Sequence, residues 1–589
     1  MSLSFRFGAA VAGLLLVGLA GCDQAPHSSA PAKKPLSQAS QQWLSIANGF
    51  SEDYLRAQPS FAAQSGRHEF DGQLPDFSSH GIKREIARLH DAREQIAAVD
   101  PAKLESIERF DREYLLSVID KDLFWLEKAR YPFSNPYWYI TSIDPDLYLS
   151  RNYAPLDERM KAYIKYARGI PKVATDIQAN LQGPLPKTYV ELGIADFGGL
   201  ADFYTKNVTA VFASVSNPEL QKQLTDADTN AAISMNNLKN YLIGQRKNAT
   251  DKFPLGKDMF AEMVKTTERV DVPIDQIEAA GRADLERNTQ ALKTECAAYL
   301  PKGTLAACVA KVSANKPQGG TLEAARAQLV ELKKFVQDHD VVSIPGNDEA
   351  LVAEAPPYNR SNAAFIQIPG PYDHGVAATY NIAPPDPKWS KAEQAAYIPS
   401  QASLLFTSVH EVWPGHFLQY LHSNANPSKL EALWVGYAFQ EGWAHYSEEM
   451  MYEEGLGMGD PEKHIGQLLD ALLRDVRLLS AIGMQTAGMT VAQSEKMFST
   501  QAFQDPGNAR QQAARGTYDP AYLNYTLGKL MIRKLRDDWI AKMAGGTAAK
   551  AAGDDKSKWH DFHDKFLSYG GPPIPLVRKE MLGELGSLL

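Results

Sequence analysis

The sequence predicts a mainly α-helical protein, with a large multi-helical body that includes one small β-sheet. Apolar residues recur at intervals of three and four over most of the chain, which is typical of helices that bury one face. Segments with the composition of β-strands are few. Hydrophobic residues make up 44% and charged residues 22% of the 589 residues, as in ordinary globular proteins, so most of the chain is not expected to be disordered or fibrous.

The helical pattern occurs along the whole body. In GIKREIARLHDAREQIAA, residues 81–98, the residues Ile82, Ile86 and Leu89 share one face among charged neighbours. The same periodicity predicts helices over residues 104–128, 157–182, 218–245, 274–299, 321–338, 403–423, 435–454, 461–486, 491–503 and 519–544. Strand signals are concentrated at residues 364–368 and 377–382, on either side of the turn-rich sequence PGPYDHGV. We therefore expect a small sheet just before the helix that begins near residue 403.

The N-terminus, MSLSFRFGAAVAGLLLVGLAGC, has the features of a secretory signal peptide. Arg6 precedes an apolar stretch that is too short for a permanent membrane-spanning helix. Its last four residues, LAGC, resemble the lipobox of bacterial lipoproteins, which implies removal of residues 1–21 and lipidation of Cys22 with acyl chains such as palmitate. An ordinary signal peptide cut near Ala20 is the alternative. We expect a lipoprotein of the bacterial cell envelope that faces the periplasm, on either the inner or the outer membrane.

The mature chain is expected to comprise a tether and one body. Residues 22–39 are rich in Pro, Ser, Ala and Gln and lack apolar periodicity, which is typical of a flexible tether after the lipidated cysteine. No linker divides residues 40–589. We interpret them as an N-terminal helical half, about 40–350, and a catalytic half, about 351–589. No later apolar run reaches the length of a membrane span.

Charge and cysteine content exclude several classes of protein. The chain has 61 Lys and Arg against 70 Asp and Glu, a net charge of -9, which argues against a general nucleic-acid binder. Three cysteines are too few for a four-thiolate zinc site. Cys296 and Cys308 flank a predicted turn, and in an oxidising compartment we expect them to form a structural disulfide.

A pair of histidines enclosing Pro and Gly is the first candidate for a metal site. The sequence from His410 to His416 is HEVWPGH, whereas helical zinc sites usually have two histidines four residues apart. Six residues turn a regular helix through about 240°, which would separate the two rings. Pro414 and Gly415 permit a kink or bulge that can bring both rings to one ion. The alternative is a helix that ends at Pro414, followed by an unrelated histidine.

A second motif, FQEGWAHYSEE at residues 439–449, offers a third ligand. Glu441 lies 25 residues after His416 on another predicted helix, and a catalytic zinc site needs three protein ligands with one open position. His445 competes as the third ligand or as a substrate contact. Glu448 shares the face of Glu441 and can orient a ligand histidine. A solvated acidic helix face is the alternative interpretation.

Together these motifs resemble the bacterial family called domain of unknown function 885. Its patterns HExxPGHxxQ, EGWAxY and YxxGxxxIxxLR occur here in this order, the last beginning at Tyr525. The resemblance covers most of the mature chain and is most specific over residues 360–540. It implies a largely helical, zincin-like body and a zinc peptidase of the gluzincin kind. Relatives often have a histidine at the position of Gln485, and a glutamine there can donate a hydrogen bond but carries no charge.

The sequence therefore leads to the hypothesis of a membrane-anchored zinc metallopeptidase that hydrolyses short peptides. His410, His416 and Glu441 would hold one Zn²⁺, and Glu411 would be the general base toward the activated water. Tyr525 is the first choice of donor to the oxyanion, or else an aromatic residue of the core. The reserve donors are Tyr522, Arg474 and Arg477, where the two arginines are otherwise expected to be solvated or salt-bridged.

Several points stay open in the sequence. The strand at 377–382 is expected either at the sheet edge, where it could pair with a substrate backbone, or inside the sheet.

The alternative function is a non-catalytic, zinc-containing or metal-free envelope lipoprotein that binds peptides or partners. The presence of Glu411 argues against it, because a binding protein needs no base. A serine hydrolase is disfavoured, since the sequence contains no G-x-S-x-G motif. Exopeptidase and endopeptidase activity are equally compatible with the sequence, which specifies no oligomeric state.

Overall fold

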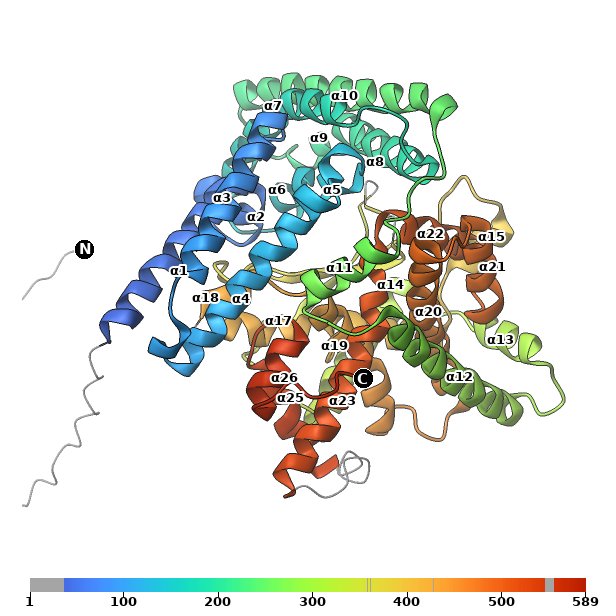
Figure 1. The fold of residues 1–589 in the computed structure, drawn as a ribbon. Coiled ribbons are helices and arrows are strands. Elements are labelled where there is room, and N and C mark those ends of the chain that lie inside the picture. The colour runs from blue at the N-terminus through green and yellow to red at the C-terminus, as the bar shows by residue number, and fades with distance from the viewer. Residues whose placement is uncertain (1–35, 357–358, 361, 427, 546–555) are drawn as a thin grey trace, which may run out of the picture.

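A computed structural model describes residues 36–356, 359–360, 362–426, 428–545 and 556–589. Most of these residues lie in helices, and one three-stranded sheet accompanies them (Figure 1), so the prediction of a mainly helical fold with a small sheet is confirmed. The predicted signal peptide, Cys22 and most of the tether lie outside the described residues. The tether was expected to reach residue 39, whereas the first helix already begins at Gln38, with the Ser37 hydroxyl capping it.

The helices fall into three successive groups along the chain. The first group is α1 (Gln38–Ala57), α2 (Pro59–Gln64), α3 (Ser79–Ala97), α4 (Ser106–Leu123), α5 (Tyr137–Ile140), α6 (Asp146–Ser150), α7 (Leu156–Asn180), α8 (Lys187–Lys206), α9 (Val208–Val211) and α10 (Pro218–Gln245). The second group is α11 (Lys257–Glu268), α12 (Ile274–Tyr299), α13 (Leu305–Ala314) and α14 (Thr321–Asp338). The third group is α15 (Lys391–Tyr397), α16 (Gln401–Glu411), α17 (His416–Ala425), α18 (Lys429–Leu433), α19 (Tyr437–Glu453), α20 (Pro461–Thr486), α21 (Val491–Gln501), α22 (Pro506–Tyr518), α23 (Asn524–Met543), α25 (Trp559–Leu567) and α26 (Ile574–Leu582).

The sheet lies between the second and third groups. It contains β1 (Ala350–Glu354), β2 (Ala364–Gln367) and β3 (Ala378–Ile382), in the order β1-β3-β2. β3 runs parallel to β1 and antiparallel to β2, and Tyr380 of β3 lies opposite Val352 and Ile366. Of the two positions expected for the strand at 377–382, the one inside the sheet is confirmed and the one at the edge is wrong, because both sides of β3 are paired. The sequence did not reveal β1, and β2 is one edge of the sheet.

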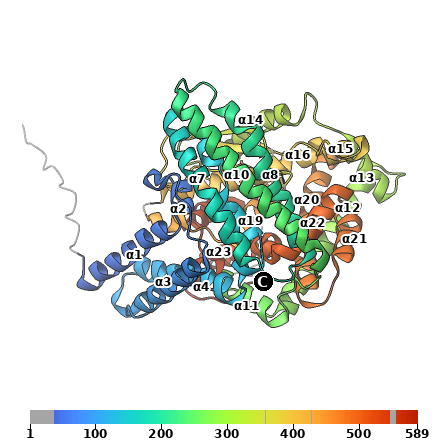
Figure 2. The ribbon, with the colours of Figure 1, turned by 90° about the horizontal axis from the view of Figure 1, so that it is seen from above.

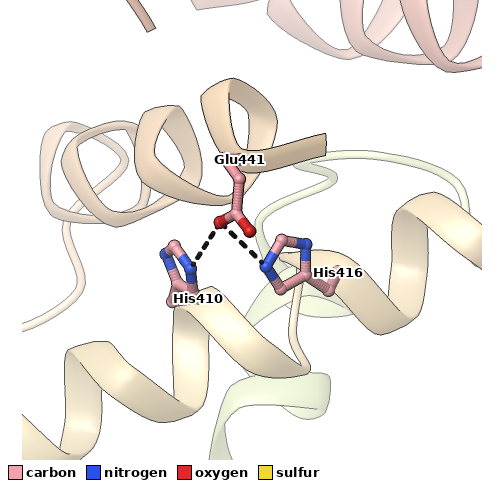
Figure 3. A group of neighbouring side chains, drawn as sticks. All are labelled: His410, His416 and Glu441. Carbon is pink, nitrogen blue, oxygen red and sulfur yellow. Dashed lines mark ion pairs between the residues drawn. The ribbon is translucent and has the colours of Figure 1, made fainter. Parts of the chain in front are cut away.

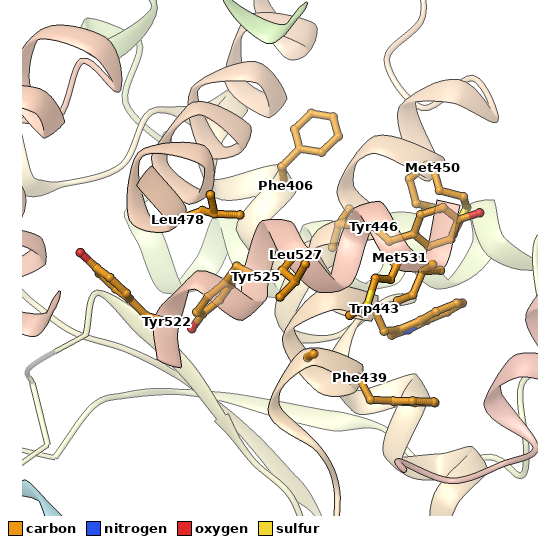
Figure 4. Close-up of a cluster of buried hydrophobic side chains, with 14 of the residues drawn as sticks. Phe406, Phe439, Trp443, Tyr446, Met450, Leu478, Tyr522, Tyr525, Leu527 and Met531 are labelled. Atoms are coloured by element: carbon orange, nitrogen blue, oxygen red, sulfur yellow. The ribbon is translucent and has the colours of Figure 1, made fainter. Parts of the chain in front are cut away.

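Three clusters of buried apolar side chains stabilise the described fold. One joins α7, α8 and α10, which lie side by side at the end of the molecule drawn at the top of Figure 1 and seen from above in Figure 2. A second lies between α1, α3 and α4. The third is the largest and combines α11–α14 with the C-terminal helices, including the aromatic side chains of α19 and α23 in Figure 4. Burial of this apolar surface is the main force that fixes α19 and α23 against each other.

Cys296 of α12 and Cys308 of α13 form the predicted disulfide, with 5.7 Å between their Cα atoms. The bridge closes the turn between these two helices. Among the described helices, none combines the length and hydropathy that a bilayer crossing requires.

Candidate metal centre

The HEVWPGH sequence forms a helix break between α16 and α17. The first helix ends at Glu411, and the second begins at His416. Across the break the backbone N–H of Gly415 donates to the carbonyl of Val409 at 3.0 Å. A Cβ atom on Gly415 would lie 1.8 Å from the carbonyl oxygen of His410, so only glycine fits this turn. The break brings the rings of His410 and His416 to 4.8 Å between centroids, at an angle of 84°.

Glu441 of α19 faces both histidines (Figure 3). Its Oε2 atom lies 3.4 Å from Nε2 of His410 and 3.3 Å from Nε2 of His416. The histidines are only 4% and 5% exposed, and the side chain of Glu441 is 13% exposed. One ligand atom from each residue can therefore meet at a single buried point, and all three atoms lie within 4.8 Å of one another.

The spacing of these atoms fits a metal ion. Tetrahedral ligands at about 2.1 Å from an ion are about 3.4 Å apart, which matches the two measured nitrogen–oxygen distances. The buried Oε2 of Glu441 has no hydrogen-bond partner among the described residues, as expected for an atom whose partner is an ion. The three residues can hold a metal ion.

Glu448, seven residues after Glu441, lies behind His410. Its carboxylate accepts hydrogen bonds from Nδ1 of His410 at 2.7 Å and from Nδ1 of His445 at 3.2 Å, and it pairs with Arg474 at 3.2 Å. Burial opposes the charged carboxylate, but Arg474 and the histidines hold its pKa well below the usual range. The bond to Nδ1 leaves Nε2 of His410 free to face Glu441.

His445 is not one of the three converging residues. Its imidazole is fully buried and donates to Glu448. Burial and the nearby ammonium of Lys529 lower its pKa to about 4, so the ring is neutral. Of the two candidates for the third ligand, the geometry brings Glu441 and not His445 to the two histidines.

Contacts between distant segments hold the arrangement together. The indole N–H of Trp443 donates to the carbonyl of Pro414 at 2.8 Å, which ties α19 to the turn before His416. Helix α19 also packs closely against α23, where Gly442 faces Gly528. A Cβ atom added to Gly442 would lie 2.6 Å from the Cα atom of Gly528. This close crossing brings the start of α23, and with it Tyr525, to the site.

The three converging residues line a cavity of about 1370 Å³. Glu411 also lines it, next to His410, and burial raises the pKa of its carboxyl above the ordinary value while the two histidines oppose the shift. A second cavity of about 880 Å³ shares Trp125, Tyr137 and Tyr437 with the first, so the two adjoin. The site is thus buried but reached through a large hollow.

Tyr525 lies on the cavity wall beside the candidate ligands. Its ring is nearly parallel to that of His410, with 6.1 Å between centroids. Its hydroxyl accepts from Nη2 of Arg515 at 3.4 Å, which leaves the phenolic proton available to another group. Tyr522, by contrast, is fully buried and donates to Ser480 at 3.1 Å.

Comparison with known proteins gives a family for this fold. A family model described as "Bacterial protein of unknown function (DUF885)" matches residues 59–581. The chain belongs to the DUF885 family. No curated protein matches the sequence.

Two solved structures resemble the DUF885 chain. A candidate lipoprotein of unknown function from Shewanella oneidensis is 22% identical, with a TM-score of 0.73 over 92% of this chain and 99% of its own. A candidate lipoprotein from Colwellia psychrerythraea is 16% identical, with a TM-score of 0.75 over 93% and 100%. Both similarities establish the fold. A candidate oligoendopeptidase F from Bacillus anthracis str. Ames is 11% identical over 87% of this chain and 93% of its own, and its TM-score of 0.31 is too low to support an inference.

The structure of the DUF885 chain does not bring Gln485 to the cavity. Its carboxamide oxygen accepts from the backbone of Leu255 at 2.9 Å, and its nitrogen donates to the carbonyl of Gly516 at 2.9 Å. The residue is 1% exposed, and its side chain joins α20 to the backbone at Leu255 and at Gly516. In this chain the glutamine has a structural position rather than a contact with the cavity.

Two residues of the cavity wall were missed by the sequence analysis. Arg515 donates to the hydroxyl of Tyr437 at 2.8 Å and to the carboxylate of Asp519 at 2.9 Å. Tyr437 precedes Glu441 by one turn of α19, so the spacing of the two residues in the sequence could have predicted that they share one helix face. Nothing in the local sequence distinguishes Arg515, because α22 reaches the site only through tertiary packing.

Proposed function

We propose that this DUF885 protein is a zinc-dependent peptidase of the bacterial envelope. The convergence of His410, His416 and Glu441, with Glu411 on the same cavity wall, is the observation that carries the proposal. Two imidazoles and one carboxylate are a ligand set typical of catalytic zinc. When bound, the ion would supply Lewis acidity toward water and toward the carbonyl oxygen of the substrate.

Glu411 has the position and environment of a general base. Its carboxylate lies at the cavity surface, next to the first histidine, and is otherwise buried. A carboxylate with a raised pKa can take a proton from the attacking water and deliver it to the nitrogen of the leaving amine. His410 and His416 limit this rise in the pKa of Glu411, which favours the ionised carboxylate before the reaction.

Tyr525 is positioned to donate a hydrogen bond to the oxyanion. Burial raises the pKa of its hydroxyl, so the proton is retained, although Arg515 opposes the shift. Arg515 occupies a lone pair of that oxygen and thereby directs the phenolic proton away from itself. Removal of one such donor typically costs a factor of about 10² to 10³ in kcat.

The cavity suits an extended peptide. Ala364, Phe365 and Ile366 of the edge strand β2 contribute to its wall. A peptide backbone can pair with an exposed strand edge, which would hold the scissile bond in register with the metal centre. This assigns to β2 the role that the sequence suggested for β3.

The N-terminal sequence supports an envelope location for this activity. The LAGC ending favours lipidation of Cys22, and the two similar structures are described as candidate lipoproteins. We propose that acyl chains on Cys22 anchor the protein with its body in the periplasm. Incorporation of labelled palmitate by the wild type and its loss in Cys22→Ala would support this anchor, whereas equal labelling would contradict it.

The function is tested with purified protein and two variants. Metal analysis should find about one zinc ion per chain, and a mixed peptide library should be cleaved. Glu411→Gln should retain zinc and lose hydrolysis by a factor of about 10² to 10⁴. Glu454→Gln, at the end of α19, is the control and should behave as wild type.

Two results would contradict this function. Absence of zinc from protein supplied with it would exclude the metal site. Zinc binding with no cleavage of any peptide would instead favour the binding lipoprotein.

A further inference from the structure

Three arginines line the cavity, and two of them are neutralised within the protein. Arg474 pairs with Glu448 at 3.2 Å and with Asp470 at 3.3 Å. Arg515 pairs with Asp519 at 2.9 Å. The charges of these two guanidinium groups are therefore balanced before any ligand arrives.

Arg477 differs from both. Its Nε donates to the amide oxygen of Gln512 at 2.8 Å, and its guanidinium lies 4.4 Å from the centre of the Tyr525 ring. Only 7% of the residue is exposed. Among the ion pairs of the described residues, none joins Arg477 to a carboxylate. Burial lowers its pKa, and the positive charges of Arg515 and Arg474 contribute in the same direction.

A buried guanidinium without an anionic partner is energetically costly, because it has lost water and gained no opposite charge. Gln512 and the Tyr525 ring compensate only in part, through one neutral hydrogen bond and one cation–π contact. The remaining N–H groups form a planar fork that matches a carboxylate. Since Arg477 lies on the cavity wall, an entering ligand can supply that carboxylate.

We infer that Arg477 binds a carboxylate of the peptide substrate and so selects peptides that present one near the cleaved bond. This inference rests on the proposed peptidase function and adds a substrate class to it. The carboxylate can be the C-terminal group of a short peptide or the side chain of Asp or Glu, since the same fork binds both.

The position of Tyr525 limits where that carboxylate lies in the substrate. The centre of the Tyr525 ring lies 4.4 Å from the guanidinium carbon of Arg477 and 6.1 Å from the centre of the His410 ring. An extended peptide that runs from the guanidinium past the Tyr525 ring to His410 needs about three residues, since each residue spans roughly 3.3–3.6 Å. The recognised carboxylate is therefore within about three residues of the bond that is cut.

The test measures binding, so that it does not depend on turnover. The zinc-loaded Glu411→Gln protein is titrated by calorimetry with tetra-alanine as the free acid and as the C-terminal amide. A second pair of amidated peptides has Glu or Gln as the last residue. Arg477→Gln is then added to the same background, and Arg510→Gln, an exposed arginine that pairs with Glu393, is the control.

The free acid or the Glu peptide should bind at least about tenfold more tightly than its neutral counterpart. In Arg477→Gln this preference should fall to about twofold or less, and in Arg510→Gln it should persist. Preference for the free acid alone identifies the C-terminal group, and preference for Glu alone identifies an acidic side chain. Arg477→Lys should retain part of the preference, because it keeps the charge but not the fork.

Several outcomes would overturn the inference. One is equal affinity for acid and neutral peptides, or no binding of any of the four, in the Glu411→Gln background. Another is a preference that survives Arg477→Gln, which would assign the carboxylate to the metal ion. An equal loss of affinity for acid and neutral peptides would show a structural role. Cleavage of amidated peptides by the wild type would still support the peptidase, so the two proposals fail separately.

Discussion

Gly442 of α19 lies directly against Gly528 of α23, so the two helices cross with their backbones in contact. A Cβ atom added to Gly528 would lie 2.2 Å from the carbonyl oxygen of Ala438. The candidate ligand Glu441 immediately precedes the first glycine, and Tyr525 lies one turn before the second. The crossing therefore sets the separation of these two candidate site residues, which explains glycine in both motifs.

We predict that Gly528→Ala reduces the stability of the protein by about 1–3 kcal/mol, because the added methyl group forces the helices apart. Thermal or urea denaturation measures the loss. The same change should weaken zinc retention, since it moves α19.

Gly244→Ala is the matched control. Gly244 is also helical, and a Cβ there meets nothing within 4 Å, so this variant should gain up to about 1 kcal/mol. Equal effects of the two substitutions would contradict the role of the crossing.

Helices could be predicted well where the sequence marks their ends. The expected limits of residues 218–245, 274–299 and 321–338 coincide with α10, α12 and α14. Asn217 followed by Pro218 is a strong start signal, and its side chain caps the first turn. The strand β1 was missed because ALVAE carries no alternation. The order of the sheet could not be predicted, because pairing depends on contacts between distant segments.

We predict that Glu448→Gln lowers zinc affinity by about 10- to 100-fold. The substitution replaces a carboxylate that holds Nδ1 of His410 with a neutral amide, which weakens the orientation and basicity of the ligand. Competition with a chelator measures the affinity. Retention of wild-type affinity would mean that packing alone orients His410.

Lys529 is a fully buried cation on α23, and its removal should destabilise the fold. Its ammonium lies against the carboxylates of Asp284 and Glu449. Lys529→Met leaves those buried charges with one partner fewer, and we expect a loss of about 3–5 kcal/mol in the free energy of unfolding. Lys534→Met on the same helix breaks a partly exposed pair with Asp538 and should cost less than about 1 kcal/mol. Similar losses for both would contradict the importance of the buried network.

His68 should contribute stability that depends on pH. It lies between Asp71 and Asp373, at 3.1 and 3.0 Å, and stacks on Tyr153. Burial lowers its pKa, but the two carboxylates outweigh this and raise it to about 9 from the ordinary 6.5. The contribution is therefore complete below about pH 6.5 and is lost as the pH rises through 9.

We accordingly expect His68→Gln to be less stable than the wild type at pH 6, by about 1 kcal/mol after solvent screening. The difference should shrink toward pH 10, where the wild-type imidazole is neutral. Unfolding midpoints of both proteins at pH 6, 8 and 10 provide the comparison. A difference in unfolding midpoint that stays constant from pH 6 to pH 10 would exclude the charge of His68 as the cause of the stabilisation.

The candidate site could be predicted in part. The residues close in sequence, His410 to His416 and Glu441 to Glu448, follow from motif spacing. The division into two halves near residue 350 stays a prediction. The position of Arg515 and the lack of a carboxylate partner for Arg477 among the described residues could not be predicted, because both depend on how α20 packs against α22 and α23. Gln485 was a candidate by its position in a motif, yet its partners are backbone groups.

The hydrogen bond from Trp443 to Pro414 ties the turn between the two histidines to the helix that carries Glu441. This protein contact therefore helps to set the spacing of the three candidate ligands. Zinc fingers, by comparison, are unfolded until the metal arrives. Under the proposed function, a chain with this bond would complete its fold after secretion and acquire its ion afterwards.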